Sequence, residues 1–118
     1  NPFNHMTVMF RKQAVISVGS YQPFYLLEDY YLWNRMANAG FKFANIGESL
    51  LWARGGYNML QRRGGWRYVV SEYHLLHFMW KSKRINFIEF VFSLFVKSIV
   101  RMIGKRGRSL LYRMFLRK

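Results

Sequence analysis

The segment from Ile85 to Ile103 constrains the fold most, because a largely apolar run of 19 residues forms either a membrane span or an amphipathic helix. Each charge in the run would cost roughly 2.5–3.5 kcal/mol at the centre of a bilayer. We therefore expect a helix that lies in a membrane interface or packs on a partner. The polar residues recur every three or four positions and so share one side of a helix, namely Asn86, Glu89, Ser93, Lys97 and Arg101.

Two other segments have the apolar period of a helix. In Glu28 to Ala39, Gly40 follows the last turn and can adopt the left-handed conformation that ends a helix. Its expected buried face is Leu32, Trp33, Met36 and Ala37 or Ala39. In Trp66 to Trp80, the expected buried face is Trp66, Val69, Val70, Tyr73, Leu76, His77 and Trp80.

Shorter patterns complete the expected fold. Arg11 to Val18 favours a short helix or turn, and Ser109 to Lys118 a second amphipathic piece. Three short segments indicate strands by their apolar and β-branched residues, namely Met6 to Phe10, Phe41 to Ile46 and Ser49 to Ala53. We therefore predict an α/β chain with few short strands, predominant helices and amphipathic helices at the C-terminal end.

Charge divides the chain into two parts. The net charge is +14, and residues 81–118 hold eleven Lys or Arg and one acid. We expect residues 1–80 to form a globular part and residues 81–118 a basic amphipathic tail that seeks an anionic surface. Because its basic residues alternate with large apolar ones, the tail favours a membrane or a protein partner over nucleic acid. The chain has no cysteine, which excludes disulfides and thiolate metal sites.

Glu28 and Asp29 are adjacent in a chain that has only five acids. They follow a loop with Gly19 and Pro23 and begin the expected helix 28–39. One interpretation is an N-cap and a first turn whose acids match the helix dipole. The other is a catalytic base, since a carboxylate at a loop–helix junction can take a proton from a hydroxyl group. Composition and spacing leave both open.

Other polar residues have similar pairs of interpretations. His5, next to Asn4, either binds a substrate hydroxyl, a phosphate or a metal, or is a hydrogen-bonded loop histidine. Arg54, Arg62 and Arg63 lie on a glycine-rich connection and either hold phosphates or face solvent. His74 and His77 have the spacing of two metal ligands, but a packed histidine is the simpler interpretation of His77.

The order of these motifs resembles a known family. Asn-Pro-Phe-Asn-His precedes Leu-Glu-Asp-Tyr-Tyr-Leu-Trp, which is followed by Gly-Phe-Lys-Phe-Ala-Asn-Ile and then by Gln-Arg-Arg-Gly-Gly. Over residues 1–80 this is similar to the C-terminal half of bacterial family 2 glycosyltransferases with the GT-A fold, of the type that builds surface polysaccharides. The tail matches only in general character.

The resemblance implies roles for individual residues. Asp29 matches the general base that deprotonates the acceptor hydroxyl, and Glu28 matches its acidic neighbour. Asn4 and His5 match the acceptor side of the cleft. Basic positions near the nucleotide diphosphate correspond to Arg54, Arg62 and Arg63. The implied reaction is an inverting transfer of a sugar from a nucleotide-sugar donor to a glycan or lipid-linked acceptor.

One part of the family pattern is missing. No Asp-x-Asp metal motif occurs, since Asp29 is the single aspartate. We therefore expect the Mg²⁺ or Mn²⁺ ligands in a missing N-terminal half of a longer enzyme, and no activity from this chain alone. The implied location is the cytoplasm, peripheral on the inner face of the cell membrane. The alternative is a non-catalytic membrane-binding or scaffolding domain.

Overall fold

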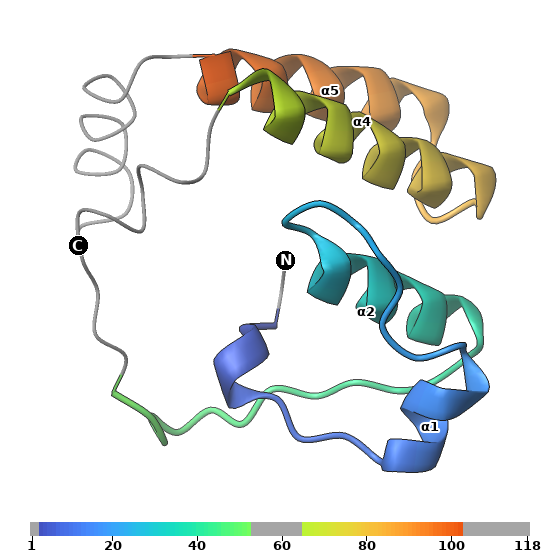
Figure 1. Ribbon diagram of the computed structural model, residues 1–118, viewed down its shortest axis with the longest axis vertical. Helices are drawn as coiled ribbons and strands as arrows, with labels where there is room; N and C mark the ends of the chain where they lie inside the picture. The colour runs from blue at the N-terminus through green and yellow to red at the C-terminus, as the bar shows by residue number, and fades with distance from the viewer. Residues whose placement is uncertain (1–2, 53–64, 103–118) are drawn as a thin grey trace. The chain divides into compact units, whose positions relative to one another are not determined.

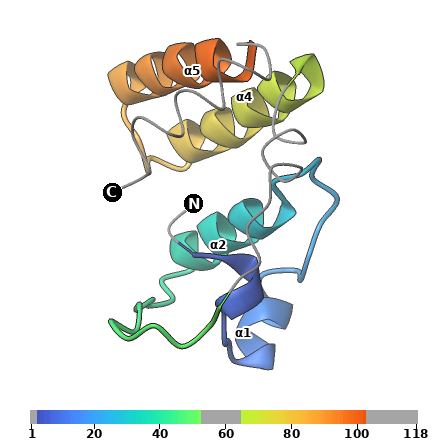
Figure 2. The same cartoon turned by 90° about the vertical axis from the view of Figure 1, so that its left-hand side faces the viewer.

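The computed structural model describes residues 3–52 and 65–102. These residues belong to two compact units, Asn1–Ala53 and Arg54–Lys118, and each unit is described here by itself. Figures 1 and 2 show their helices in two views. The helices are η1 (His5–Thr7), α1 (Lys12–Ser17), α2 (Glu28–Asn38), α4 (Trp66–Lys81) and α5 (Phe87–Met102).

The first unit packs α1 against α2 around a small apolar core. This core consists of Val15 from α1 with Leu32, Trp33 and Met36 from α2. Both helices end at a glycine with positive φ, Gly19 at +85° and Gly40 at +84°. The expected helix 28–39, three of its buried residues and its glycine stop are therefore confirmed. The short helix expected within residues 11–18 is confirmed as well.

The second unit is a hairpin of α4 and α5, which lie side by side in both views (Figures 1 and 2). Lys83 adopts a left-handed conformation at the turn, with φ +57°. Arg84 N donates to Met79 O, which closes the end of α4. At the start of α5, Asn86 and Glu89 each accept a 2.8 Å hydrogen bond from the other's backbone N–H, as in a capping box. The expected helices 66–80 and 85–103 are thus confirmed apart from their ends.

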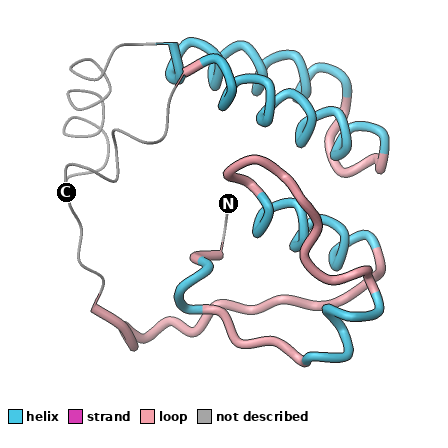
Figure 3. Tube along the Cα trace, in the orientation of Figure 1, coloured by secondary structure: helices cyan, strands magenta, loops and turns pink. Residues whose placement is uncertain are grey.

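The prediction of an α/β fold with short strands is wrong for residues 3–52 and 65–102, which contain helices and loops but no strand (Figure 3). The expected strand at 6–10 consists of the end of a 3₁₀ turn followed by a loop. The expected strand at 41–46 is a loop, and so are residues 49–52 of the third expected strand. Val8 has strand-like dihedral angles, with φ −88° and ψ 138°. A strand also needs a hydrogen-bonded neighbour, and these segments form no ladder with one another.

The predicted buried face of α4 is partly wrong. Val69 and Leu76 are buried, whereas Trp66, Tyr73 and Trp80 are exposed. The buried face is rotated around the helix, and its other members are Tyr68, Ser71, Glu72 and Leu75. This rotation places a carboxylate, rather than an aromatic ring, at the centre of the helix pair.

Among the described helices, none combines the length and the apolar character needed to cross a membrane. The second amphipathic piece expected at Ser109 to Lys118 lies outside the described residues.

Candidate active site

The loop between α1 and α2 is held in place by Arg35 of α2. Its guanidinium donates hydrogen bonds to two loop carbonyls, Val18 O at 2.6 Å and Ser20 O. The same group lies 4.8 Å from the centroid of the Tyr31 ring. Because Arg35 can bind two carbonyls at once through its planar fork, it fixes the loop immediately before Tyr21.

Tyr21 brings this loop into contact with the N-terminal segment. Its hydroxyl lies 3.3 Å from Nδ1 of His5, and the donor depends on the histidine tautomer. The two rings meet edge to face, with centroids 5.7 Å apart. Both side chains are exposed, so their polar atoms can still reach a ligand. His5 is therefore hydrogen-bonded, as one of its interpretations expected, although it begins η1 and does not lie in a loop.

Glu28 and Asp29 are the first two residues of α2, where acids stabilise the positive end of the helix dipole. Neither serves as the N-cap, which is Leu27 and makes no side-chain capping bond. Asp29 Oδ1 accepts a 2.6 Å hydrogen bond from Tyr30 N. Asp29 is half-buried and Glu28 is exposed. This geometry supports the dipole-matched first turn, whereas the N-cap part of that interpretation is wrong, because Leu27 occupies the N-cap position.

Electrostatics link the acids to Tyr21. The pKa of Tyr21 is raised above its ordinary value of 10.0, first by burial and then by the charges of Asp29 and Glu28. The tyrosine hydroxyl thus lies within electrostatic reach of both carboxylates and stays protonated at neutral pH. We call His5, Tyr21, Glu28 and Asp29 the acceptor cluster. It combines three residues singled out in the sequence with one, Tyr21, that was not.

Asn4 takes a structural position beside this cluster. It caps η1, since its Oδ1 accepts a 3.4 Å hydrogen bond from Met6 N. It also lines a groove of about 830 Å³ in the first unit, together with Trp33, Met36 and residues 41–46. None of the four residues of the acceptor cluster lines this groove. The candidate chemistry at the cluster therefore lies outside this groove.

The three arginines expected near a diphosphate, Arg54, Arg62 and Arg63, lie outside the described residues. In the part of the chain that is described, no group of three or more His, Cys, Asp or Glu can hold a metal ion. His77 is half-buried and stacks on Tyr73 with ring centroids 5.8 Å apart.

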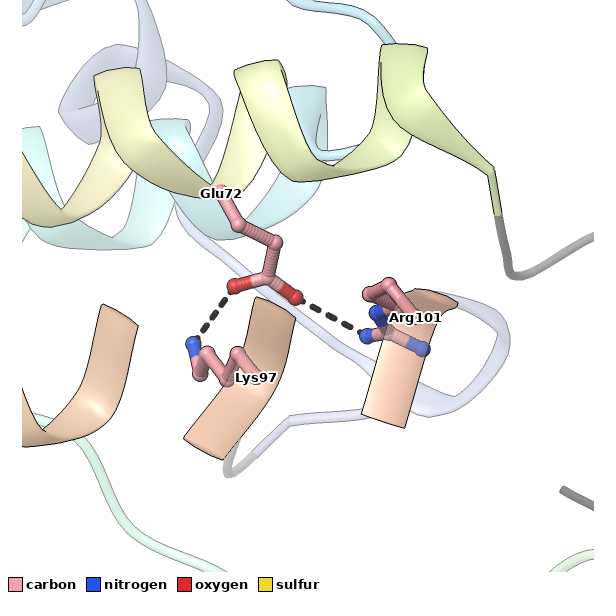
Figure 4. Close-up of polar contacts among 3 residues, drawn as sticks. All are labelled: Glu72, Lys97 and Arg101. Atoms are coloured by element: carbon pink, nitrogen blue, oxygen red, sulfur yellow. Dashed lines mark hydrogen bonds and ion pairs between the residues drawn. The ribbon is translucent and has the colours of Figure 1, made fainter. Parts of the chain in front are cut away.

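A second polar cluster, which the sequence did not reveal, lies between α4 and α5 (Figure 4). Glu72 accepts hydrogen bonds from Lys97 at 2.6 Å and from Arg101 at 2.9 Å, one on each carboxylate oxygen. Its side chain is only 4% exposed. Burial alone would raise the pKa of Glu72, but the hydrogen bonds and charges of Arg101 and Lys97 outweigh it and lower the pKa. We call these three residues the Glu72 clamp.

The clamp corrects the interpretation of the polar stripe on α5. Lys97 and Arg101 point to the neighbouring helix, so part of the stripe is an interior contact. The sequence does contain a signal for this ion-pair cluster. One acid lies in an apolar helix, and the next helix carries two cations four residues apart. Tyr21 and Arg35 carried no such signal, because their roles depend on contacts between distant segments.

The known proteins that are similar to this chain are bacterial glycosyltransferases. The chain is 38% identical over 112 residues to the amylovoran biosynthesis glycosyltransferase AmsE of Erwinia amylovora, and the match covers 95% of the chain and 42% of the relative. It is 35% identical over 117 residues to an uncharacterised glycosyltransferase of Haemophilus influenzae, covering 99% of the chain and 43% of that protein.

A third relative carries a defined reaction in its name. The chain is 30% identical over 118 residues to the UDP-Gal:alpha-D-GlcNAc-diphosphoundecaprenol beta-1,3-galactosyltransferase of Escherichia coli, covering 100% of the chain and 43% of the relative. No protein-family model and no solved structure matches the chain. The chain spans less than half the length of these relatives. The resemblance to bacterial glycosyltransferases is thereby confirmed: the chain is homologous to a part of bacterial glycosyltransferases, among them one of amylovoran biosynthesis.

Proposed function

We propose that this chain supplies the acceptor side of an inverting, family 2 glycosyltransferase. The complete enzyme transfers a sugar from a nucleotide-sugar donor to a hydroxyl group of a lipid-linked or polysaccharide acceptor. The observation that carries the proposal is the acceptor cluster, in which the Tyr21 hydroxyl lies 3.3 Å from the His5 imidazole. The charges of Asp29 and Glu28, at the start of α2, add to the raised pKa of that hydroxyl. The names of the relatives give the reaction class.

In this reaction Asp29 takes the proton of the acceptor hydroxyl as its oxygen attacks the anomeric carbon of the donor. A new bond forms between that oxygen and the carbon, while the bond from the carbon to the diphosphate breaks. The nucleoside diphosphate leaves with the electron pair, and the configuration inverts because the two oxygens lie on opposite faces. Glu28, Tyr21 and His5 orient the acceptor hydroxyls through hydrogen bonds.

Charge on the leaving diphosphate needs compensation. We assign this role to Arg54, Arg62 and Arg63, whose guanidinium groups suit phosphate oxygens. A divalent cation, Mg²⁺ or Mn²⁺, would neutralise further charge when bound, through ligands outside the described residues. The complete enzyme acts at the inner face of the cytoplasmic membrane, where its lipid-linked acceptor and the basic tail meet.

The test is the substitution Asp29→Asn in the complete enzyme. A general base contributes about 10²–10⁴-fold, so release of nucleoside diphosphate from nucleotide sugars in the presence of undecaprenyl-diphosphate-linked acceptors should fall by that factor. The circular dichroism spectrum should not change. The matched control is Glu48→Gln, which removes an exposed carboxylate of the same unit and should keep wild-type turnover. Turnover near wild type in Asp29→Asn would remove Asp29 as the base.

A further inference from the structure

The α4–α5 hairpin buries a charged cluster among its apolar contacts and exposes large apolar side chains on α5. The Glu72 clamp occupies the helix interface, with Lys97 and Arg101 side chains 34% and 17% exposed (Figure 4). Arg101 also stacks on Tyr68 of α4 at 4.1 Å. A water-exposed helix usually shows the opposite pattern, with charges towards solvent and apolar groups towards its neighbour.

The opposite side of α5 carries a continuous apolar stripe. Its members follow one another at intervals of three or four residues, so they share one face. At about 100° per residue, this face is turned roughly half a revolution from Lys97 and Arg101. We call it the outer stripe: Ile88 (78% exposed), Phe92 (67%), Phe95 (64%), Ile99 (45%) and Met102 (63%).

Basic residues precede and follow the outer stripe in the sequence. Exposed Lys81, Lys83 and Arg84 lie at the turn before α5. In the sequence after Met102, six Lys or Arg and no acid follow. An apolar surface between two basic ends complements an anionic lipid surface, which offers acyl chains between its headgroups.

The same arrangement disfavours a second copy as the occupant. Two copies packed along this stripe would bring basic ends together in either direction, parallel or antiparallel, and like charges repel. A full crossing of the bilayer is disfavoured too, because 16 helical residues span about 24 Å and the hydrocarbon core is about 30 Å thick.

We propose that the outer stripe of α5 lies in the interfacial layer of an anionic lipid bilayer. The Glu72 clamp makes this possible, since it turns two cations away from the acyl chains and pairs them with a carboxylate inside the hairpin. This inference rests on the membrane location proposed above and sharpens it, because it names the face that enters the lipid. The helix lies along the surface, with the basic residues at both ends among the headgroups.

Vesicle flotation of the 118-residue chain tests this placement with phosphatidylcholine vesicles that contain or lack phosphatidylglycerol. The triple variant Ile88→Ser, Phe92→Ser, Phe95→Ser should lose at least about tenfold in partitioning to the anionic vesicles. The matched control removes three exposed apolar side chains of the first unit, Met9→Ser, Ile46→Ser and Leu50→Ser, and should partition as the wild type does.

A second variant removes the positive charges of the turn before α5 by Lys81→Gln, Lys83→Gln and Arg84→Gln. It distinguishes binding through the outer stripe from binding through these charges alone. Loss of binding in the turn variant but wild-type binding in the outer-stripe variant would overturn the inference and keep the membrane location. No binding of the wild type to either vesicle would overturn both. A wild-type dimer that the outer-stripe variant converts to a monomer, without lipid binding, would assign the stripe to a second copy.

A spectroscopic measurement does not depend on equal folding of the triple variant. The chain has no cysteine, so a single cysteine can carry an environment-sensitive dye. A dye at Phe92→Cys should shift to the blue when anionic vesicles are added. A dye at His74→Cys, on an exposed position of α4, should not shift. Equal shifts at both positions, or none at Phe92→Cys, would contradict the proposed face.

Discussion

The two units contain carboxylates in opposite situations. Asp29 and Glu28 begin α2; Asp29 is half-buried, Glu28 is exposed, and the charges of both act on Tyr21. Glu72 is 4% exposed, and each of its oxygens accepts a hydrogen bond from a cation. The difference distinguishes the two sites. Both oxygens of Glu72 are held by cations, so this carboxylate has a structural role, whereas Asp29 is the carboxylate that we propose as the base.

The largest effect on stability should come from removing the buried carboxylate. Glu72→Gln leaves Lys97 and Arg101 in the helix interface without their counter-charge. We expect the free energy of unfolding to fall by about 3 kcal/mol, near the lower end for a broken buried pair, because Lys97 is partly exposed. Chemical denaturation of the chain measures this. Glu48→Gln, at an exposed acid, should stay within about 0.5 kcal/mol of wild type.

The clamp should also give stability a pH dependence of known sign. The folded-state pKa of Glu72 lies below its ordinary value of 4.5. The contribution is therefore complete above pH 4.5 and is lost as the pH falls through the lower folded-state pKa. Denaturation midpoints measured from pH 7 downward should show this decline in the wild type and a smaller one in Glu72→Gln. Parallel curves would exclude the clamp as its cause.

A smaller effect is expected from the capping box of α5. Glu89→Ala or Asn86→Ala removes one of two reciprocal bonds and should cost about 1 kcal/mol of stability. Because the two side chains act together, the double variant should cost less than the sum of the single variants. Additive losses in a double-mutant cycle would show that the two bonds are independent.

The smallest effect should appear in the acceptor cluster when only an orienting group is removed. Tyr21→Phe deletes the hydroxyl that contacts His5, and turnover of the complete enzyme should fall about 2–10-fold, the range of one hydrogen bond. Tyr73→Phe, in the other unit, should leave turnover unchanged. A loss as large as that of Asp29→Asn would give Tyr21 a role in the proton transfer itself.

Periodicity predicted the helices because their hydrogen bonds are local. Gly40 ends α2 as expected, and Leu32, Trp33 and Met36 form its buried face. The strands could not be predicted in the same way, since a strand exists only with a neighbour. Val8 has the right dihedral angles but no ladder.

One residue of α4 indicates which side of α5 faces its neighbouring helix. Glu72 sets which side of α5 turns inward, because a buried carboxylate requires cations beside it. The sequence predicted the stripe of polar residues on α5, but it did not predict that Lys97 and Arg101 of this stripe face α4. In the first unit, Asp29 could be singled out from its sequence context, whereas Tyr21 joins it only through a loop held by Arg35.

The most direct test compares Asp29→Asn and Glu72→Gln in the complete enzyme by turnover and by thermal unfolding. We predict that Asp29→Asn loses turnover by about 10²–10⁴-fold and keeps the unfolding temperature of the wild type. Glu72→Gln should unfold at a lower temperature and keep its turnover per folded molecule. Wild-type turnover in Asp29→Asn, or a loss of turnover without loss of stability in Glu72→Gln, would contradict the division between a working and a structural carboxylate.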